Sequence, residues 1–140
     1  MFSQRIREII LRRKKKTVGE KTVSGEVDAE TFNDLDKMKR NFGLPKKQIV
    51  SDAIDAWVKN DLKIDETNLI GNQKKPLSVG INTSLKKKYN EKMEKEGRVK
   101  YISLGLIIKA YIDNTFKDEG ALNFQKLLNE RRKYRERCSR

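Results

Sequence analysis

Residues 21 to 32, KTVSGEVDAETF, alternate apolar and polar side chains and then change to a helical period. Residues 75 to 86, KPLSVGINTSLK, make the same change. Aligning the two stretches places Ser24 on Ser78, and the same alignment places Gly43 on Gly97 and Trp57 on Tyr111. Few residues are identical, but chemical class and period match, which indicates one structural unit written twice.

Each copy is predicted to begin with a short strand, because apolar residues recur there at every second position. The side chains expected on one face are Val23, Gly25 and Val27 in the first copy and Leu77, Val79 and Ile81 in the second. The side chains expected on the opposite face are Thr22, Ser24, Glu26, Pro76, Ser78 and Gly80.

Two helices are predicted to follow each strand. Asp28 and Asn82 stand where the period changes, and both residue types are favourable N-caps. Gly43 and Gly97 then suit the left-handed position after a helix. A second helix is expected from about 46 to 60 in the first copy and from about 100 to 116 in the second. A single strand leaves an edge unpaired, so the two copies are expected to pair their strands.

This pattern resembles the ribbon-helix-helix DNA-binding proteins, the group that includes the Arc and MetJ repressors, in which two chains build an antiparallel ribbon that enters the major groove. With the motif twice in one chain, it is similar to the TraY-like accessory proteins of conjugative plasmids. The resemblance implies a mainly α fold with a two-stranded antiparallel β-ribbon, in which two β-α-α units form an intramolecular pseudo-dimer. The implied division is a basic arm (1–20), a first unit (21–62), a linker (63–74), a second unit (75–116) and a basic C-terminal helix (117–140).

The resemblance also implies a DNA site on the ribbon. The residues expected to contact bases are Thr22, Ser24, Glu26, Ser78 and Gly80. Hydroxyl groups donate or accept at base edges, and a glutamate accepts from the amino group of cytosine. The family often has a basic or amide residue at these positions, which this chain lacks, so ordinary solvent-facing strand residues are the alternative. The residues expected to contact phosphates, beside the ribbon and at the start of the second helices, are Lys21, Lys46, Lys47, Lys74, Lys75 and Lys100.

The charge of the chain favours a polyanionic partner. The 140 residues hold 33 Lys and Arg against 20 Asp and Glu, a formal charge of +13. Most of the excess lies in two tails, whose clustered basic residues are Arg12, Arg13, Lys14, Lys15, Lys16, Arg131, Arg132 and Lys133. The arm is expected to follow phosphates, with packing on the core or binding to a membrane surface as alternatives. The two units differ in charge and outward residues, which predicts an asymmetric DNA site rather than a palindrome.

Several classes of protein are disfavoured by composition. The chain has one cysteine, Cys138, and no histidine, so we expect no metal site, no cofactor and no catalytic activity. No apolar run approaches the roughly 18 residues of a membrane span, and we expect a soluble, cytoplasmic protein.

The sequence therefore predicts a sequence-specific binder of double-stranded DNA, either a repressor-type transcriptional regulator or a DNA-transfer accessory factor of a plasmid or virus. Both would use the same contacts. The alternative is an antitoxin-like module in which residues 117–140 bind a protein partner. The same segment would also suit self-association of two pseudo-dimers.

Overall fold

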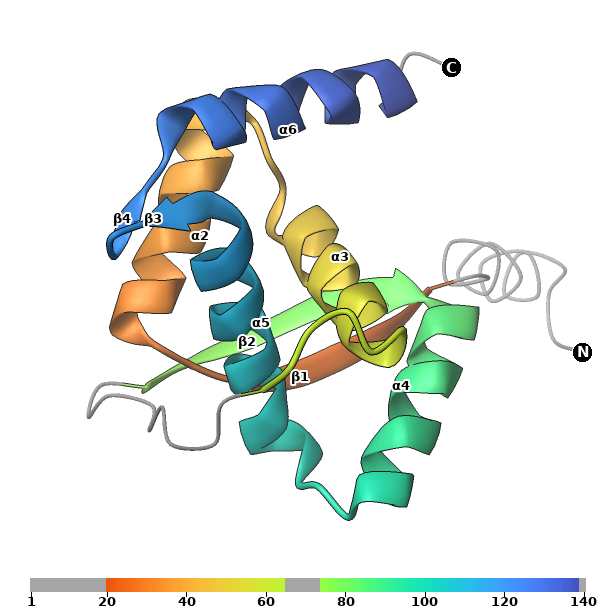
Figure 1. Cartoon of the computed structure of the whole chain (residues 1–140). Coiled ribbons are helices and arrows are strands. Elements are labelled where there is room, and N and C mark those ends of the chain that lie inside the picture. The colour runs from red at the N-terminus through yellow and green to blue at the C-terminus, as the bar shows by residue number, and fades with distance from the viewer. Residues whose placement is uncertain (1–19, 65–73, 139–140) are drawn as a thin grey trace, which may run out of the picture.

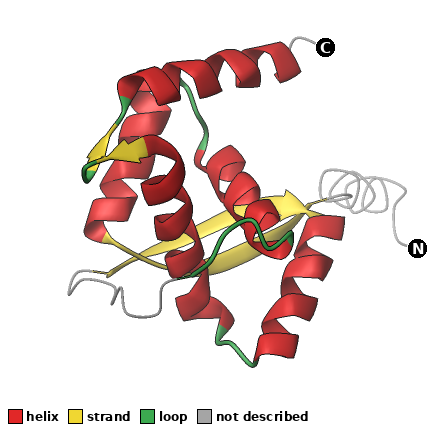
Figure 2. Cartoon of the chain, viewed as in Figure 1, coloured by secondary structure: helices red, strands yellow, loops and turns green. Residues whose placement is uncertain are grey.

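Strand, helix and helix follow one another twice along the chain (Figures 1 and 2). The computed structural model describes residues 20–64 and 74–138. These residues form a mainly helical fold with a small two-stranded antiparallel sheet and one short hairpin. The elements are β1 (Glu20–Asp28), α2 (Ala29–Phe42), α3 (Lys46–Val58), β2 (Lys74–Asn82), α4 (Thr83–Glu96), α5 (Lys100–Phe116), β3 (Lys117–Asp118), β4 (Ala121–Leu122) and α6 (Phe124–Cys138).

The register of the ribbon, β1 paired with β2, agrees with the alignment of the sequence repeat. The strands are antiparallel, and Ser24 lies opposite Ser78, its counterpart in the other repeat. Two steps away on either side, Thr22 lies opposite Gly80 and Glu26 lies opposite Pro76. The pairing of the two strands is therefore symmetric about the central serine pair. Exchanging each residue for its counterpart in the other repeat reproduces the same set of pairs. The predicted pairing of the two strands is confirmed.

The predicted caps are also confirmed. Asp28 Oδ1 accepts from the Thr31 N–H at 2.7 Å, and Asn82 Oδ1 accepts from the Ser84 N–H at 2.8 Å. Gly43 and Gly97 follow α2 and α4 with φ angles of 67° and 66°, in the left-handed region that glycine adopts without strain. These four positions fix where the first helix of each unit begins and ends.

Two helices differ in their bounds from the predicted ranges. The second helix of the first unit ends at Val58 rather than near residue 60, because Asn60 adopts a positive φ and the Asp61 N–H donates back to the Ala56 carbonyl. Lys92 then donates to the Trp57 carbonyl and to Asn60 Oδ1. The C-terminal segment predicted as a basic helix over 117–140 begins instead with a short hairpin, in which Ala121–Leu122 pairs with Lys117–Asp118, and its helix α6 begins at Phe124. Asn123 then caps α6 through its Oδ1.

The core lies between one face of the ribbon and the helices. The ribbon contributes Val23, Val27, Leu77 and Ile81, all nearly inaccessible to solvent. The largest buried helical side chains are Leu35, Met38, Ile49, Ile54, Met93, Leu104, Ile107, Ile108, Ile112 and Phe116. Each fully buried aliphatic side chain contributes about 1.5 to 3 kcal/mol. The alternation of the strands thus leaves their other face free of the core.

Two glycines allow α5 to lie very close to β1. A Cβ atom on Gly105 would stand 2.0 Å from the Glu26 carbonyl oxygen, and one on Gly25 would stand 2.8 Å from the Tyr101 carbonyl oxygen. The corresponding positions of the other repeat are Ser51 and Val79, which carry side chains. The helix-to-strand packing of the two halves is therefore unequal.

An ion pair joins the two units at the start of α2. Lys109 Nζ of α5 lies 3.3 Å from Asp28 Oδ2, and Asp28 is only 7% exposed. Burial raises the pKa of the Asp28 carboxyl, but its bonds to Thr31 and Lys109 outweigh burial and hold the pKa below its usual value. The same carboxylate thus caps one unit and binds the other.

Replacing Asp28 by asparagine should remove the ion pair and keep the cap, since Asn82 caps α4 in the same way. A carboxylate with a depressed folded pKa stabilises the fold above its unfolded pKa, about 3.9, and loses that contribution as the pH falls through the folded pKa. Asp28→Asn should cost about 1 to 2 kcal/mol at pH 7 and progressively less below pH 4. Urea unfolding at pH 7 and pH 3 measures the difference, with exposed Asp61→Asn as the control. An equal cost at both pH values would contradict the ion pair.

Candidate nucleic-acid interface

The face of the ribbon opposite the core is open to solvent. Thr22, Ser24 and Ser78 are exposed, and Glu26 and Gly80 are partly exposed. The structure thus brings the five predicted base-contacting residues onto one surface. The alternation of the strands continues one step further at one end of the ribbon, where Glu20 and Asn82 are opposite one another and both exposed. The sequence prediction missed these two, although the same period of two would have found them.

A pair of hydroxyl groups occupies the centre of this face. Ser24 Oγ and Ser78 Oγ lie 3.1 Å apart, and either one can be the donor. A hydroxyl is both a donor and an acceptor, so the pair retains one free O–H and several lone pairs. The centre of the ribbon can therefore bond to a group of either kind.

Two carboxylates flank the serines, and each has a partner at the start of a helix. Glu20 forms an exposed ion pair with Lys47 of α3. Glu26 lies beside Tyr101 of α5: desolvation, the charge of Glu26 and a hydrogen bond to Glu26 together raise the pKa of the Tyr101 hydroxyl. Lys47, predicted to contact phosphate, is thus bound to a carboxylate of the ribbon in the free protein.

A second group of lysines meets at one aromatic ring. Lys46 Nζ lies 4.2 Å and Lys75 Nζ lies 4.9 Å from the centre of the Phe32 ring. Cation–π contacts of this kind contribute about 0.5 to 1 kcal/mol each at exposed sites. The ring of one unit therefore gathers a strand lysine and a helix lysine. Phe32 also packs against the core, and no local pattern of the sequence indicated its contact with the two lysines.

The other predicted lysines lie along the ribbon and its helices. Lys21, Lys74 and Lys100 are exposed, and Lys86 of α4 donates to the Thr22 carbonyl at 2.6 Å. No side chain caps the start of α3 or α5, where Pro45 and Val99 are the N-cap residues. Uncapped N–H groups at a helix start favour anions.

The basic C-terminal residues lie apart from the ribbon. Arg131, Arg132 and Lys133 are on α6, whose main contacts are with α2 and α5. Figure 1 shows α6 at the end of α2 that is remote from the ribbon, where Phe42 and Phe124 stack with ring centres 5.8 Å apart. The predicted N-terminal basic cluster, Arg12, Arg13, Lys14, Lys15 and Lys16, lies outside the described residues.

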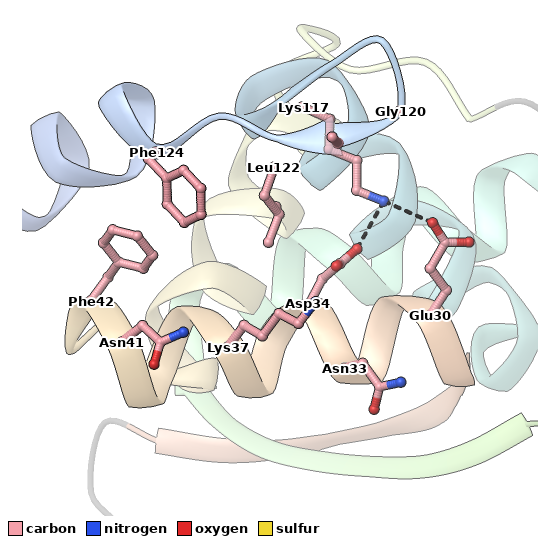
Figure 3. A pocket seen from close by; sticks show the side chains of 11 residues that line it. Glu30, Asn33, Asp34, Lys37, Asn41, Phe42, Lys117, Gly120, Leu122 and Phe124 are labelled. Atoms are coloured by element: carbon pink, nitrogen blue, oxygen red, sulfur yellow. Dashed lines mark hydrogen bonds and ion pairs between the residues drawn. The ribbon is translucent and has the colours of Figure 1, made fainter.

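A pocket of about 710 Å³ lies between α2, the β3–β4 turn and the start of α6 (Figure 3). Lys117 stands in its wall, with Nζ 2.8 Å from Asp34, 3.2 Å from Glu30 and 3.4 Å from Asp113. Burial lowers the pKa of this ammonium, but hydrogen bonds to Asp34 and Glu30 outweigh burial and raise the pKa above its usual value. Lys117 therefore remains charged and joins the two units rather than acting as a base.

Two structural features that would indicate other functions are absent from residues 20–64 and 74–138, the part of the chain that the structure describes. No group of three or more His, Cys, Asp or Glu side chains is placed to hold a metal ion in this part of the chain. None of the helices that the structure describes is both long and apolar enough to cross a membrane.

Comparison with known proteins gives no relative. No protein-family model, no curated protein and no solved structure matches the chain. The geometry of the ribbon and the pattern of the sequence therefore carry the functional argument alone.

Proposed function

We propose that the chain is a tandem ribbon-helix-helix protein that binds double-stranded DNA by inserting the β1–β2 ribbon into the major groove. The observation that carries this proposal is the intramolecular ribbon itself: Ser24 faces Ser78, its counterpart in the repeat, and the polar face around them is exposed. A two-stranded ribbon fits the major groove, which is about 12 Å wide.

The charges beside the ribbon support DNA as the partner. Lys46 and Lys75 are held together at Phe32. Three more lysines are exposed on the strands and at the start of α5: Lys21, Lys74 and Lys100. Contacts from such lysines to phosphates fix the position of a protein on DNA without reading its sequence. The ribbon residues then supply the sequence preference.

Selection of bound duplexes from a random DNA pool at about 150 mM salt tests the proposal, since this salt screens exposed charges beyond about 8 Å. The chain should enrich one motif. Changing Ser24 and Ser78 to alanine together should relax the centre of that motif and keep the fold, as measured by circular dichroism. Enrichment of no motif would contradict the proposal. The genomic position of the enriched motif, near a promoter or near a transfer origin, distinguishes a repressor from a transfer accessory factor.

Replacing Phe32 by leucine should weaken binding to every duplex by about threefold, because Lys46 and Lys75 lose the ring that holds them. The enriched motif should not change, since phosphate contacts carry no sequence information. Fluorescence anisotropy with an unrelated duplex at several salt concentrations measures the loss. Tyr134→Leu, a partly buried aromatic on α6, is the matched control, and an equal loss there would contradict a role for Phe32 in positioning the lysines.

A protein partner is the second candidate function, and one observation favours it. Phe124 and Leu128 of α6 are 66% and 45% exposed, one helical turn apart on a basic helix. Such an apolar pair suits a helix-in-groove contact of the kind an antitoxin makes, or the contact of two copies of the chain. Copurification of a second small protein, lost in a Phe124→Ser and Leu128→Ser variant, would support it.

A further inference from the structure

The carboxylates of Glu20 and Glu26 lie at equivalent places on the exposed face of the ribbon, one in each half. The two residues are nevertheless not counterparts in the sequence repeat. Glu26 is the repeat counterpart of Gly80 when Ser24 is aligned with Ser78. A Cβ atom on Gly80 would stand 3.2 Å from Oε2 of Glu20, so the Glu20 carboxylate lies over the glycine. Glu20 thus fills, in one half of the ribbon, the place that Glu26 holds in the other.

The helices support the same correspondence. Glu20 binds Lys47 and Glu26 binds Tyr101. Lys47 and Tyr101 are the second residues of α3 and α5, and they too are counterparts in the repeat. Each carboxylate is therefore held by the equivalent position of the equivalent helix. Alignment of the two repeats hides this relation, because it pairs Glu26 with glycine and Glu20 with Lys74.

We infer that Glu20 and Glu26 are two specificity-determining residues that each accept a hydrogen bond from an exocyclic amino group of a base in the major groove, cytosine above all. This inference rests on the proposed function. An ionised carboxylate has no donor, so it cannot bond to the O6 and N7 atoms of guanine or to O4 of thymine. It offers about four lone-pair sites, and one partner at Lys47 or Tyr101 leaves acceptor capacity for a base.

The charge of the surroundings strengthens the argument. Phosphates repel carboxylates, and yet a chain with a charge of +13 carries two on the exposed face of its ribbon, each paired with a neighbouring side chain. A carboxylate disfavours guanine and thymine because its oxygen would then face another acceptor, with no hydrogen to share between the two. The carboxylates therefore favour cytosine mainly by excluding guanine and thymine.

The ribbon also sets the expected spacing of the two bases. Glu26 lies two residues from Ser24 in one direction, and Gly80, under Glu20, lies two residues from Ser78 in the other. Four strand steps of about 3.3 Å give about 13 Å, or about four base-pair steps of 3.4 Å. The target should thus carry two cytosines on opposite strands, symmetric about its centre. The asymmetry predicted from the sequence then comes from the Thr22 and Pro76 positions and from exposed Asn82, whose repeat counterpart Asp28 is buried.

The test is the same selection, carried out with Glu20→Gln and Glu26→Gln. A glutamine bonds to N6 and N7 of adenine. In each variant the base preference at one cytosine position of the motif should therefore shift toward adenine by about tenfold. The two variants should change different positions. Glu91→Gln, an exposed position on α4, makes the same change of charge and should leave the motif as it is. Circular dichroism confirms that each variant is folded.

Two outcomes would overturn the inference, and they are distinguishable. If the wild-type chain enriches a motif that neither variant alters, the carboxylates do not read bases and the proposed function stands. If the wild-type chain enriches no motif, the proposed function fails and the inference fails with it.

Discussion

Replacing Lys117 by methionine is expected to lower the free energy of unfolding by about 3 kcal/mol. Methionine keeps most of the length of the side chain and removes the ammonium that binds Asp34, Glu30 and Asp113. Asp34 is 8% exposed, and without Lys117 its carboxylate would be buried with no positive charge beside it. Urea unfolding at pH 7 measures the loss.

Two further variants separate the ion pairs from the packing. Asp34→Asn in the Lys117→Met background should restore much of the loss, because the uncompensated charge is then gone. Lys126→Met, which removes an exposed ion pair to Asp118, should change stability by less than about 1 kcal/mol. The pKa of Lys117 is raised by folding, so its contribution is complete below about pH 10 and is lost only as the pH rises through the folded pKa. A Lys117→Met variant as stable as the wild type would contradict the network.

Replacing Gly105 by alanine is the second large effect. The new Cβ would stand 2.0 Å from the Glu26 carbonyl oxygen, a backbone atom, so α5 and β1 must separate. Overpacking of this kind costs about 1 to 3 kcal/mol or more, and it exceeds the gain of about 1 kcal/mol in helix propensity. We expect a net loss of about 2 kcal/mol and weaker DNA binding, since Glu26 lies at the contact.

Gly80→Ala is the matched control for Gly105→Ala. Its Cβ would meet only the end of the Glu20 side chain, at 3.2 Å, and that side chain can rotate. Stability should change by less than about 0.5 kcal/mol. If both variants unfold at the same urea concentration as the wild type, the close packing of α5 on β1 is contradicted.

The elements that sequence predicted are those governed by local chemistry. The strands around Ser24 and Ser78 follow from a period of two, and Asp28, Asn82, Gly43 and Gly97 act as caps that any isolated helix would use. The register of the ribbon could be predicted from the sequence, because the alignment of the repeats places Ser24 on Ser78. The period of two in each strand and the register between the strands agree, because both follow from the alternation of buried and exposed side chains.

The features that sequence missed depend on contacts between the units. Lys92 of the second unit donates to Asn60 just after α3, and Lys117 meets three carboxylates from two helices. Phe32 has an ordinary place in an apolar stripe, and only the fold brings Lys46 and Lys75 to its ring. The role of Glu20 was hidden because it depends on the absence of a side chain at Gly80, which belongs to the other strand and the other repeat. The periodicity of apolar residues in the sequence does not indicate contacts between residues of different elements.

The pairing of β1 with a strand from the second repeat has a consequence for synthesis on the ribosome. β1 is complete at Asp28, but α5, which covers it, ends at Phe116. At about 5 to 20 residues per second, the nascent chain carries β1 without its cover for roughly 4 to 18 s. During that time Val23 and Val27 lack the cover that α5 gives them in the folded chain, and pairing with the same strand of a neighbouring nascent chain becomes possible. Translation rate, and the crowding of ribosomes, should therefore decide how much of the product exchanges strands between chains instead of closing its own ribbon.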